Sequence, residues 1–454
     1  MELKLPNNAS ANNSKGAYYI ETFGCQMNVR DSETAAGLLE TSGYTRAESR
    51  DSADLILFNT CCVRDHAEKR VFGNIGALKE QKDENPNLIL GVFGCMTQQK
   101  DVAQKLFRRF PFVNIVFGTN LLSKLPSFVE HAEAGERTLA VEEGNIVIED
   151  ELPSARTGTI NAFVNINYGC DNYCTYCIVP YVRGRERSRN PDSIVAEIER
   201  LVQEGYSEIT LLGQNVNSYG NDLEGTDFAD LLQRVSRVKG LERIRFMTSH
   251  PKDLSERVIA AMASLPNVCH HVHLPLQSGS NEILRRMNRK YTREQYLTIV
   301  KKLREAMDDV EITTDIIVGF PGETEQDFAE TLDLIEQVGF AAAFTFKYSP
   351  RKGTRAADYP DQVPEPVKRE RLRVLNDLQE RKSRENNEKY LGASGVVHVE
   401  DCDTRNEPVC YGKFSNFKMV YFPGGPELIG QYVRVRVKQV RKNSLSGEME
   451  ENNL

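Results

Sequence analysis

The chain has 454 residues, of which 40% are hydrophobic and 27% charged, and its formal net charge is −8. This length exceeds one ordinary hydrophobic core and indicates about two to four domains. No apolar run approaches the roughly 20 residues of a membrane span, which excludes an integral membrane protein and favours a soluble, cytoplasmic one. The acidic balance excludes a surface that is basic throughout, so any nucleic-acid binding must be local.

The N-terminal part predicts a loose tail followed by a doubly wound α/β domain. Residues 1–15 are polar and Asn-rich without the apolar stretch of a signal peptide, so we expect a disordered tail. Over residues 16–135, the β-rich runs AYYIETFGC, DLILFNTC and LILGVFGC alternate with helical patterns. Residues 136–157 are acidic and weakly periodic, and we expect a linker with at most a short hairpin.

The rest of the chain predicts a second α/β domain and a small β domain. Residues 158–387 contain six strand candidates that alternate with helical segments, which favours a partial (β/α)6 barrel. Functional residues of such a barrel gather at the C-terminal ends of its strands. Residues 388–454 alternate apolar and polar positions in GVVHVED, FKMVYF and QYVRVRVKQV, which predicts a small antiparallel β-barrel.

Three closely spaced cysteines carry the strongest chemical signal. Cys170, Cys174 and Cys177 follow a predicted strand with C-x3-C-x2-C spacing. In a long chain from a reducing compartment, such clustering indicates metal binding or catalysis. Three thiolates suit a [4Fe-4S] cluster with one open iron. A structural zinc site normally needs a fourth ligand, and none lies nearby in the chain; three unrelated thiols are the remaining alternative.

This triad, with the aromatic Tyr176 before its last cysteine, resembles the radical S-adenosylmethionine superfamily. The resemblance implies that the open iron holds the methionine moiety of S-adenosylmethionine, and that one electron cleaves this cofactor to a 5′-deoxyadenosyl radical. It also implies cofactor contacts at Tyr176, Gln214, Asn215, Gln277, Ser278 and Asp315. For each polar residue of this set, capping a strand end is an equally good interpretation.

A second set of cysteines follows the strands of the N-terminal domain. Cys25, Cys61 and Cys95 each stand at the C-terminal end of one predicted parallel strand, where ligands of a doubly wound sheet converge. We therefore expect a second metal cluster there, with small buried hydrophobic residues as the alternative. Cys61 is preferred to Cys62 because it directly follows the strand. The other cysteines have no partner spacing and are interpreted as structural: Cys269, Cys402 and Cys410.

Two three-cysteine sites in separate domains, with the phrases FGCQMNVRDSE, NTCCVRDHAEKR and RGRERSR, resemble the methylthiotransferase family over nearly the whole chain. The resemblance implies two [4Fe-4S] clusters, and S-adenosylmethionine as both radical source and methyl donor. The second cluster would deliver sulfur to an unactivated carbon, and no catalytic residue is expected beyond the cluster ligands. The final barrel resembles a TRAM domain, which implies RNA binding.

Two further segments suggest the substrate. LLGQNVNSYG and FMTSHPKDLS are most similar to family members that convert N6-isopentenyladenosine at position 37 of tRNA, next to the anticodon, to its 2-methylthio derivative. Family members that act on a ribosomal-protein aspartate or on threonylcarbamoyladenosine in tRNA are the alternatives. We expect a monomer that binds the anticodon stem-loop, takes electrons from a flavodoxin or ferredoxin, and does not bind a membrane.

Basic residues in two places are candidates for RNA contact. Arg434, Arg436 and Lys438 alternate with valines in VRVRVKQVRK, which places the cations on one face. Alternation alone predicts only a half-buried strand, but a cationic face in an acidic chain favours RNA. Arg183, just beyond the triad, is a further candidate, and it could equally hold the cofactor carboxylate or pair with neighbouring acids.

Two other classes of protein fit part of the pattern. A non-catalytic electron carrier also binds iron-sulfur clusters, but it needs neither a β/α barrel nor an RNA-binding barrel. A zinc-stabilised RNA-binding protein is the second, and a brown, air-sensitive preparation would exclude it.

Overall fold

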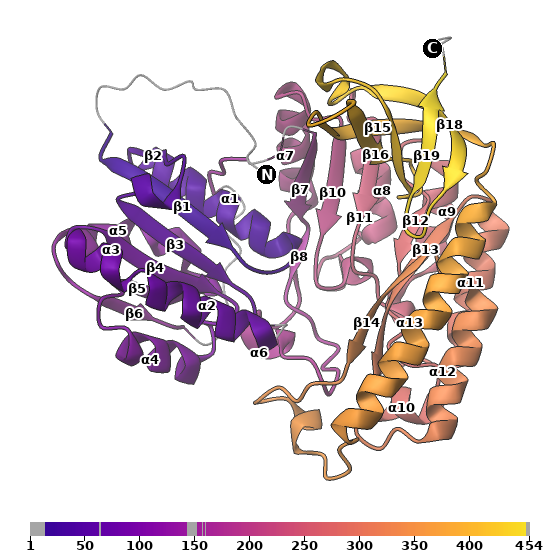
Figure 1. The fold of residues 1–454 in the computed structure, drawn as a ribbon, viewed down its shortest axis with the longest axis horizontal. Coiled ribbons are helices and arrows are strands. Elements are labelled where there is room, and N and C mark those ends of the chain that lie inside the picture. Colours follow the sequence, from indigo (N-terminus) through magenta and orange to yellow (C-terminus); the bar gives the residue numbers. More distant parts are fainter. Residues whose placement is uncertain (1–13, 63–64, 143–151, 157, 159, 451–454) are drawn as a thin grey trace. The chain divides into compact units, whose positions relative to one another are not determined.

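The computed structural model describes residues 14–62, 65–142, 152–156, 158 and 160–450. Most of the predicted tail, and residues 143–151 and 157 of the predicted linker, lie outside these ranges. The chain forms two compact units (Figure 1). Unit 1 comprises residues up to 158 with 163–171 and 178–193, and unit 2 comprises 159–162, 172–177 and 194–454. Two segments of the predicted 158–387 domain therefore pack within unit 1.

Unit 1 is built, in its described part, on a six-stranded parallel sheet with the order β2-β1-β3-β4-β5-β6. The strands are β1 (Gly16–Thr22), β2 (Tyr44–Arg46), β3 (Leu55–Thr60), β4 (Ile89–Gly94), β5 (Ile115–Gly118) and β6 (Thr138–Ala140). The helices are α1 (Gln26–Thr41), α2 (Asp65–Ala77), α3 (Lys79–Glu84), α4 (Lys100–Arg109), α5 (Leu125–Glu133) and α6 (Val179–Val182), with short 3-10 helices η1 (Arg50–Ser52) and η2 (Thr119–Lys124). A two-stranded sheet pairs β8 (Asn167–Tyr168) with β9 (Arg187–Ser188).

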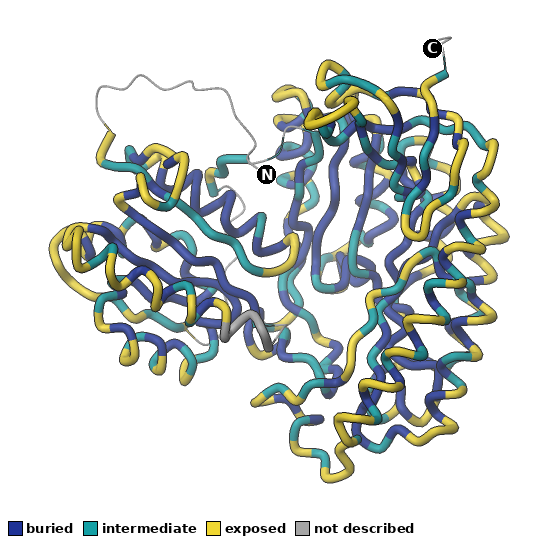
Figure 2. Tube along the Cα trace, viewed as in Figure 1, coloured by how far each residue is buried: buried dark blue, intermediate teal, exposed yellow. Residues whose placement is uncertain are grey.

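Helices cover both faces of this sheet, as the sequence predicts. Residues of one parity in β3, Leu55 and Leu57, pack into the core that contains Leu39 of α1. The other parity, Ile56 and Phe58, packs into the core with residues of α2 and α4. Every residue of β3 is therefore buried (Figure 2), which explains an apolar run without alternation.

One sequence prediction in this unit is wrong. Thr138–Ala140, expected in an irregular linker, forms β6 and pairs in parallel with β5. Further along the predicted linker, Ala155 donates a backbone hydrogen bond to the Glu33 carbonyl, and Arg156 pairs with the Glu33 carboxylate at 2.9 Å. These contacts place both parts of the predicted linker in the N-terminal domain. The sequence did not indicate β6 because a three-residue strand is too short to show periodicity.

The described strands of the partial barrel form two three-stranded sheets, β11-β10-β7 and β12-β13-β14. They belong to unit 2, except that β7 has residues in both units. A parallel bridge between Ile244 and Val268 links the two sheets. The strands are β7 (Asn161–Asn165), β10 (Glu208–Leu212), β11 (Arg243–Phe246), β12 (His271–His273), β13 (Glu311–Val318) and β14 (Ala342–Lys347). The helices are α7 (Pro191–Gln203), α8 (Phe228–Ser236), α9 (Glu256–Ser264), α10 (Asn281–Arg286), α11 (Arg293–Ala306), α12 (Glu325–Val338) and α13 (Glu365–Glu388), with η3 (Val216–Ser218), η4 (Pro251–Asp253) and η5 (Arg355–Asp358). All six predicted strands are confirmed.

Helix α13 fastens the end of the partial barrel to the last domain. Near its start, Lys368 donates to the Tyr348 carbonyl at 3.1 Å, and Arg371 pairs with Glu323 at 2.7 Å. Near its end, Asn387 donates to the Arg441 carbonyl at 3.2 Å. The helix is thus held by polar contacts at both ends, although its sequence is mostly charged.

The C-terminal domain is a closed barrel with the order β15-β16-β17-β19-β18 in the described residues. Its elements are β15 (Ser394–Asp403), β16 (Val409–Lys413), β17 (Met419–Pro423), η6 (Pro426–Leu428), β18 (Tyr432–Val440) and β19 (Leu445–Met449). The pairing of β17 with β19 is parallel, so the predicted antiparallel barrel needs this correction. Cys402 and Cys410 face each other across β15 and β16 and form a disulfide, a pairing that sequence spacing did not suggest.

A buried charge cluster joins the partial barrel to the C-terminal barrel. Glu208 of β10 accepts a hydrogen bond from Arg245 at 2.7 Å and lies 3.1 Å from His398 of β15. Burial favours a raised pKa for Glu208, but Arg245 and His398 outweigh it and lower this pKa to about 2. Arg243 and Arg245 also donate to barrel carbonyl groups, those of Val396, Lys413, Phe414 and Ser415. The charged groups are therefore compensated within the contact.

No helix in the described ranges combines the length and apolar character needed to cross a membrane.

Candidate cluster and cofactor sites

The cysteines that follow the strands of the six-stranded sheet gather at its C-terminal edge. Cys25 follows β1 and precedes α1, Cys61 follows β3, and Cys95 follows β4. These three strands are parallel neighbours, so their ends lie side by side. A Cβ built on Gly24 would lie 3.0 Å from the Cys61 Cβ, which shows how close the first two loops are. Cys25 is exposed, whereas Cys61 and Cys95 are buried.

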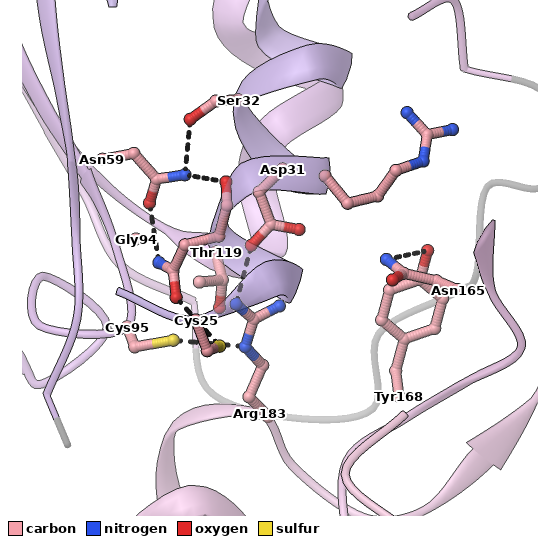
Figure 3. Close-up of polar contacts among 12 residues, drawn as sticks. Cys25, Asp31, Ser32, Asn59, Gly94, Cys95, Thr119, Asn165, Tyr168 and Arg183 are labelled. Atoms are coloured by element: carbon pink, nitrogen blue, oxygen red, sulfur yellow. Dashed lines mark hydrogen bonds and ion pairs between the residues drawn. The ribbon is translucent and has the colours of Figure 1, made fainter. Parts of the chain in front are cut away.

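A buried arginine contacts one of these cysteines, Cys95 (Figure 3). Arg183, from the segment after α6, donates through Nε to Cys95 Sγ at 3.2 Å and pairs through Nη2 with Asp31 at 2.7 Å. Asp31 lies on α1, directly after the Cys25 loop, so Asp31 orients the guanidinium toward the sulfur atoms. The positive charge stabilises thiolate at this edge, which is the form that binds metal.

Cys62 is also part of this cluster of thiols. It hydrogen-bonds Cys95 and packs with it against Ile178 and Val182. That hydrogen bond, together with Arg183, lowers the pKa of the Cys95 thiol against the opposing effect of burial. The same contact with Cys95 and burial raise the pKa of Cys62. The structure thus brings both Cys61 and Cys62 to the edge and does not select between them.

Two buried asparagines hold the Cys25 loop against β3. Asn28 donates to Asn59 Oδ1 at 2.9 Å, and Asn59 donates back to the Asn28 carbonyl at 2.7 Å. Asn59 also donates to Ser32 at 2.9 Å (Figure 3). The Cys25 thiol donates to Asn28 Oδ1 at 3.4 Å. The phrases GCQMN and FNTCC therefore place their asparagines as a scaffold for their cysteines.

In the described residues no group of three or more His, Cys, Asp or Glu side chains is arranged to hold a metal ion as it stands. The donor chemistry nonetheless suits an iron-sulfur cluster, because several thiols gather beside a compensating cation. The assignment of a cluster to Cys25, Cys61 and Cys95 stays a prediction.

The C-x3-C-x2-C loop is divided between the units, Cys170 in unit 1 and the other two cysteines in unit 2. Gly169 has φ +74°, and a Cβ there would lie 2.0 Å from the Arg185 carbonyl oxygen, so only glycine fits before Cys170. In unit 2, Asn288 donates to the carbonyls of Asn172 and Tyr173 at 3.2 and 2.9 Å. Backbone contacts thus fix the loop on each side.

A second buried arginine contacts this loop. Arg289 donates to Cys174 Sγ at 3.4 Å, to the Pro275 carbonyl at 2.9 Å and to the Tyr291 hydroxyl at 3.2 Å. Tyr176, whose pKa is raised mainly by burial, packs against the core around Met287. Each of the two cysteine sites therefore has a guanidinium on one of its sulfur atoms.

Buried polar atoms without a hydrogen-bond partner lie at the ends of β10, β11 and β12 in unit 2. Asn217 Nδ2, Ser249 Oγ, His250 Nε2 and Gln277 Oε1 are buried and have no hydrogen-bond partner among the described residues. His250 Nδ1 accepts from the Lys252 amide, and burial lowers the pKa of this ring, so the neutral ring carries its proton on Nε2. Such groups normally find a partner. These four atoms comprise two N–H donors, one hydroxyl and one carbonyl acceptor, a set that suits a polar ligand with carboxylate, amine and hydroxyl groups.

The predicted cofactor residues have different positions. Gln277, with its left-handed backbone (φ +69°), belongs to the group just described. Asn215 donates to the Asp253 carboxylate of η4 at 2.7 Å, and its cofactor contact stays a prediction. Ser278 is fully buried against Thr331 of α12, so this hydroxyl does not fit a cofactor contact. Asp315 lies 3.5 Å from His273 and is partly exposed. Gln214 follows β10, and its cofactor contact stays a prediction.

The predicted RNA contacts also separate. Arg183 is buried and paired with Asp31 and Cys95, which fits the alternative that it pairs with an acid and argues against the predicted RNA contact. On β18, Arg434, Arg436 and Lys438 are exposed and the intervening valines are buried, which confirms the alternation. Their face is not purely cationic, since these residues pair with Glu450 and Glu448. RNA contact by this strand stays a prediction.

Sequence reasoning missed Arg289, Asn217, Ser249 and His250. The last two lie in FMTSHPKDLS, directly after a predicted barrel strand, so their position was available as a signal. Arg289 lies far along the chain from the triad, and only the fold brings it to Cys174.

Family models match three segments of the chain. The radical SAM superfamily matches residues 164–335, the TRAM domain matches residues 388–449, and an uncharacterised protein family, UPF0004, matches residues 17–118. The matches follow the partial barrel, the C-terminal barrel and the N-terminal sheet in that order.

Curated relatives match almost the full length. A tRNA-2-methylthio-N(6)-dimethylallyladenosine synthase of Clostridium botulinum strain Langeland is 51% identical over 96% of this chain and 97% of its own. Synthases with the same name from Caldicellulosiruptor saccharolyticus and Thermoanaerobacter sp. strain X514 are also 51% identical, over 96% and 98% of this chain and 93% and 95% of theirs.

Solved structures share the fold. The radical S-adenosylmethionine methyltransferase TsrM from Kitasatospora setae has a TM-score of 0.53 at 15% identity, covering 86% of this chain and 79% of its own. The cobalamin-dependent S-adenosylmethionine radical enzyme OxsB has a TM-score of 0.52 at 14% identity, covering 81% of this chain and 56% of its own.

A partial β/α barrel that carries a C-x3-C-x2-C loop and matches the radical SAM model defines a radical S-adenosylmethionine enzyme, and its superfamily implies a [4Fe-4S] cluster and S-adenosylmethionine. With half of its residues identical to the curated relatives over nearly their whole length, the chain belongs to the family of tRNA-2-methylthio-N(6)-dimethylallyladenosine synthases.

Proposed function

We propose that this enzyme adds a methylthio group to C2 of N6-isopentenyladenosine at position 37 of tRNA. The observation that carries the proposal is the presence of two thiol sites, each beside a buried guanidinium, in a chain half identical to synthases named for this product. A single cluster at the C-x3-C-x2-C loop would not require Cys25, Cys61 and Cys95 at one sheet edge. A TRAM domain supports an RNA substrate.

Two clusters are part of the proposal. Cys170, Cys174 and Cys177 would hold the cluster that binds S-adenosylmethionine, and Cys25, Cys61 and Cys95 would hold the second. When bound, S-adenosylmethionine would supply the carbon-centred radical and the methyl group, and the second cluster would supply the sulfur. Arg289 and Arg183 would compensate the negative charge of the thiolates, one at each site.

The remaining contacts follow from the strand ends and the barrel. Gln277, together with Asn217, Ser249 and His250, would bind the polar groups of S-adenosylmethionine. The exposed cations of β18, Arg434, Arg436 and Lys438, would contact phosphates of the anticodon stem-loop, exchanging their acidic partners for RNA. A flavodoxin or ferredoxin would supply electrons, and the enzyme would act as a monomer.

Anaerobic turnover tests the proposal. Reconstituted enzyme is mixed with S-adenosylmethionine, a reductant and isopentenylated tRNA. The tRNA is then digested to nucleosides, which are analysed by mass spectrometry. We expect the methylthio derivative from wild type, and neither product nor cofactor cleavage from Cys174→Ala. Cofactor cleavage without modification of this tRNA would contradict the substrate and direct attention to threonylcarbamoyladenosine or a ribosomal-protein aspartate.

Single alanine variants at the N-terminal cysteines test the second cluster. Cys25→Ala and Cys95→Ala should keep cofactor cleavage but lose methylthio product and one cluster's share of iron. Cys61→Ala should behave the same way, and Cys62→Ala should retain product. The reverse result for the last pair would assign Cys62 as the ligand.

A further inference from the structure

Two large aromatic side chains are exposed on strand β14. Phe344 is 54% exposed and Phe346 is 39% exposed. They are two residues apart, so both point to the same face of the strand. The alternate residues Thr345 and Lys347 point to the other face, where Thr345 donates to Asn376 of α13 at 2.6 Å and Lys347 pairs with Glu365. The phenylalanines therefore lie on the face turned away from the covering helix, inside the partial barrel.

Neighbouring strands continue this inner face. In the parallel register, Asp315 of β13 is opposite Phe344, and Ile317 is opposite Phe346. His273 of β12 contacts Phe344 edge to face, with ring centroids 5.9 Å apart, and lies 3.5 Å from Asp315. We call Phe344 and Phe346, with His273 and Asp315 at their margin, the aromatic platform.

The platform lies at the catalytic end of the barrel. Phe346 is the second-last residue of its strand, and functional groups of β/α barrels gather at that end. Its register partner Ile317 packs against the same small core as Tyr176 of the C-x3-C-x2-C loop. The exposed rings therefore adjoin the part of the barrel that holds the cysteine loop.

An exposed aromatic pair is costly on an edge strand. In the sheet order β12-β13-β14, β14 is the terminal strand, and such strands usually carry charge to prevent association. Phenylalanines that were only structural would be buried, as Phe320 and Phe340 are. Aromatic side chains that stay exposed inside an RNA-modifying site are suited to stack on a splayed base, because every base has a π-face.

We propose that the aromatic platform binds the target adenine and selects its apolar N6 substituent. This rests on the proposed function and adds how the enzyme distinguishes its substrate. One ring stacks on the base and the other contacts the branched hydrocarbon. Asp315 stands beside Phe344, so a base whose N6 group ends in a carboxylate, as threonylcarbamoyladenosine does, is disfavoured by like charge.

The test compares two anticodon stem-loops that differ only in the N6 isopentenyl group. Affinity of the reconstituted enzyme for each is measured anaerobically, together with cofactor cleavage and methylthio product. Stacking losses on removal of one ring correspond to roughly 5- to 150-fold in affinity. We expect Phe344→Ala and Phe346→Ala to weaken binding of the isopentenylated stem-loop within this range and to bring the ratio of the two affinities toward one. Phe344→Tyr should keep the wild-type ratio.

The controls separate the possible outcomes. Leu139→Ala removes a side chain that is 37% exposed on β6 of unit 1, outside the platform and the TRAM domain, and should change neither affinity. Phe344→Leu keeps an apolar side chain but no ring, and should lose affinity while iron content stays at the wild-type level. Unchanged affinity ratios in both alanine variants would overturn the platform. Absence of methylthio product from wild type would instead overturn the proposed function, whatever the binding ratios are.

Discussion

Removing the charge of Glu208 should destabilise unit 2 strongly. In Glu208→Gln the carboxylate is lost, while Arg243 and Arg245, whose side chains are 7% and 3% exposed, keep their charges. Breaking a buried ion pair by removing one partner costs about 3–5 kcal/mol. For a unit of this size each kcal/mol corresponds to roughly 2–4 °C, so we expect Tm to fall by roughly 6–20 °C.

Anaerobic calorimetry of wild type and variant measures this loss. The matched control is Glu256→Gln, since Glu256 pairs with Lys302 on the surface with its side chain 80% exposed, and an ion pair so open to solvent should change Tm little. Replacing Arg245 by Met in the Glu208→Gln background should recover part of the loss, because one uncompensated charge disappears. A Tm of Glu208→Gln within about 2 °C of wild type would refute the reasoning.

The same carboxyl group predicts a pH dependence. Its pKa is lowered from an ordinary value of 4.5 to about 2 in the folded protein, so its contribution is present above about pH 4.5 and is lost as the pH falls toward 2. Glu208→Gln should therefore flatten the acid limb of the stability curve over that interval. An unchanged slope would contradict the sign.

Three further changes have defined outcomes. Gly94→Ala should lower the free energy of unfolding by more than the control Gly205→Ala, for which we expect a loss of about 1–2 kcal/mol in denaturant titration. Both glycines have positive φ, but at Gly94 an added Cβ would lie 2.4 Å from the Thr60 carbonyl oxygen, whereas at Gly205 it would meet nothing. Equal losses would contradict this reasoning. Arg183→Gln should raise the pKa of the Cys95 thiol, lowering the ultraviolet thiolate absorbance of metal-free protein at pH 7, whereas Arg183→Lys should restore part of it. His250→Phe should weaken S-adenosylmethionine binding by roughly 5- to 150-fold at unchanged iron content, and unchanged affinity would remove His250 from the cofactor site.

Much of the fold could be predicted because its strands are long and apolar. The three N-terminal runs that end in cysteine, and the six strands of the partial barrel, all form where periodicity placed them. Short strands were missed in the N-terminal domain: β2 and β6 have three residues each and β5 has four. β12 is equally short, but it lies within the longer run HHVHLPLQSGS, which marked it as a strand. The pairing of Cys402 with Cys410 depends on the register of β15 with β16, and β16 was not recognised in the sequence.

The candidate site was predictable where the chemistry is local and not where it depends on tertiary contacts. Spacing identified the triad, and strand ends identified Cys25, Cys61 and Cys95. The role of Arg183 stayed open because the sequence shows an arginine-rich run but not which member is buried. Its pairing with Asp31 joins residues 152 positions apart, a contact that no local pattern contains.

The geometry of helix α13 fixes the direction in which the side chains at its two ends point. The buried positions Arg371 and Asn387 are sixteen residues apart, which is about 24 Å of rise and, at about 100° per residue, a net rotation of roughly 160°. The side that binds Glu323 and the side that reaches the C-terminal barrel are therefore nearly opposite. Inserting one residue between them would turn one contact by about 100° and lose it. The number of residues in α13 therefore sets the distance and orientation between its two contacts, so the helix tolerates surface substitutions but not insertions or deletions.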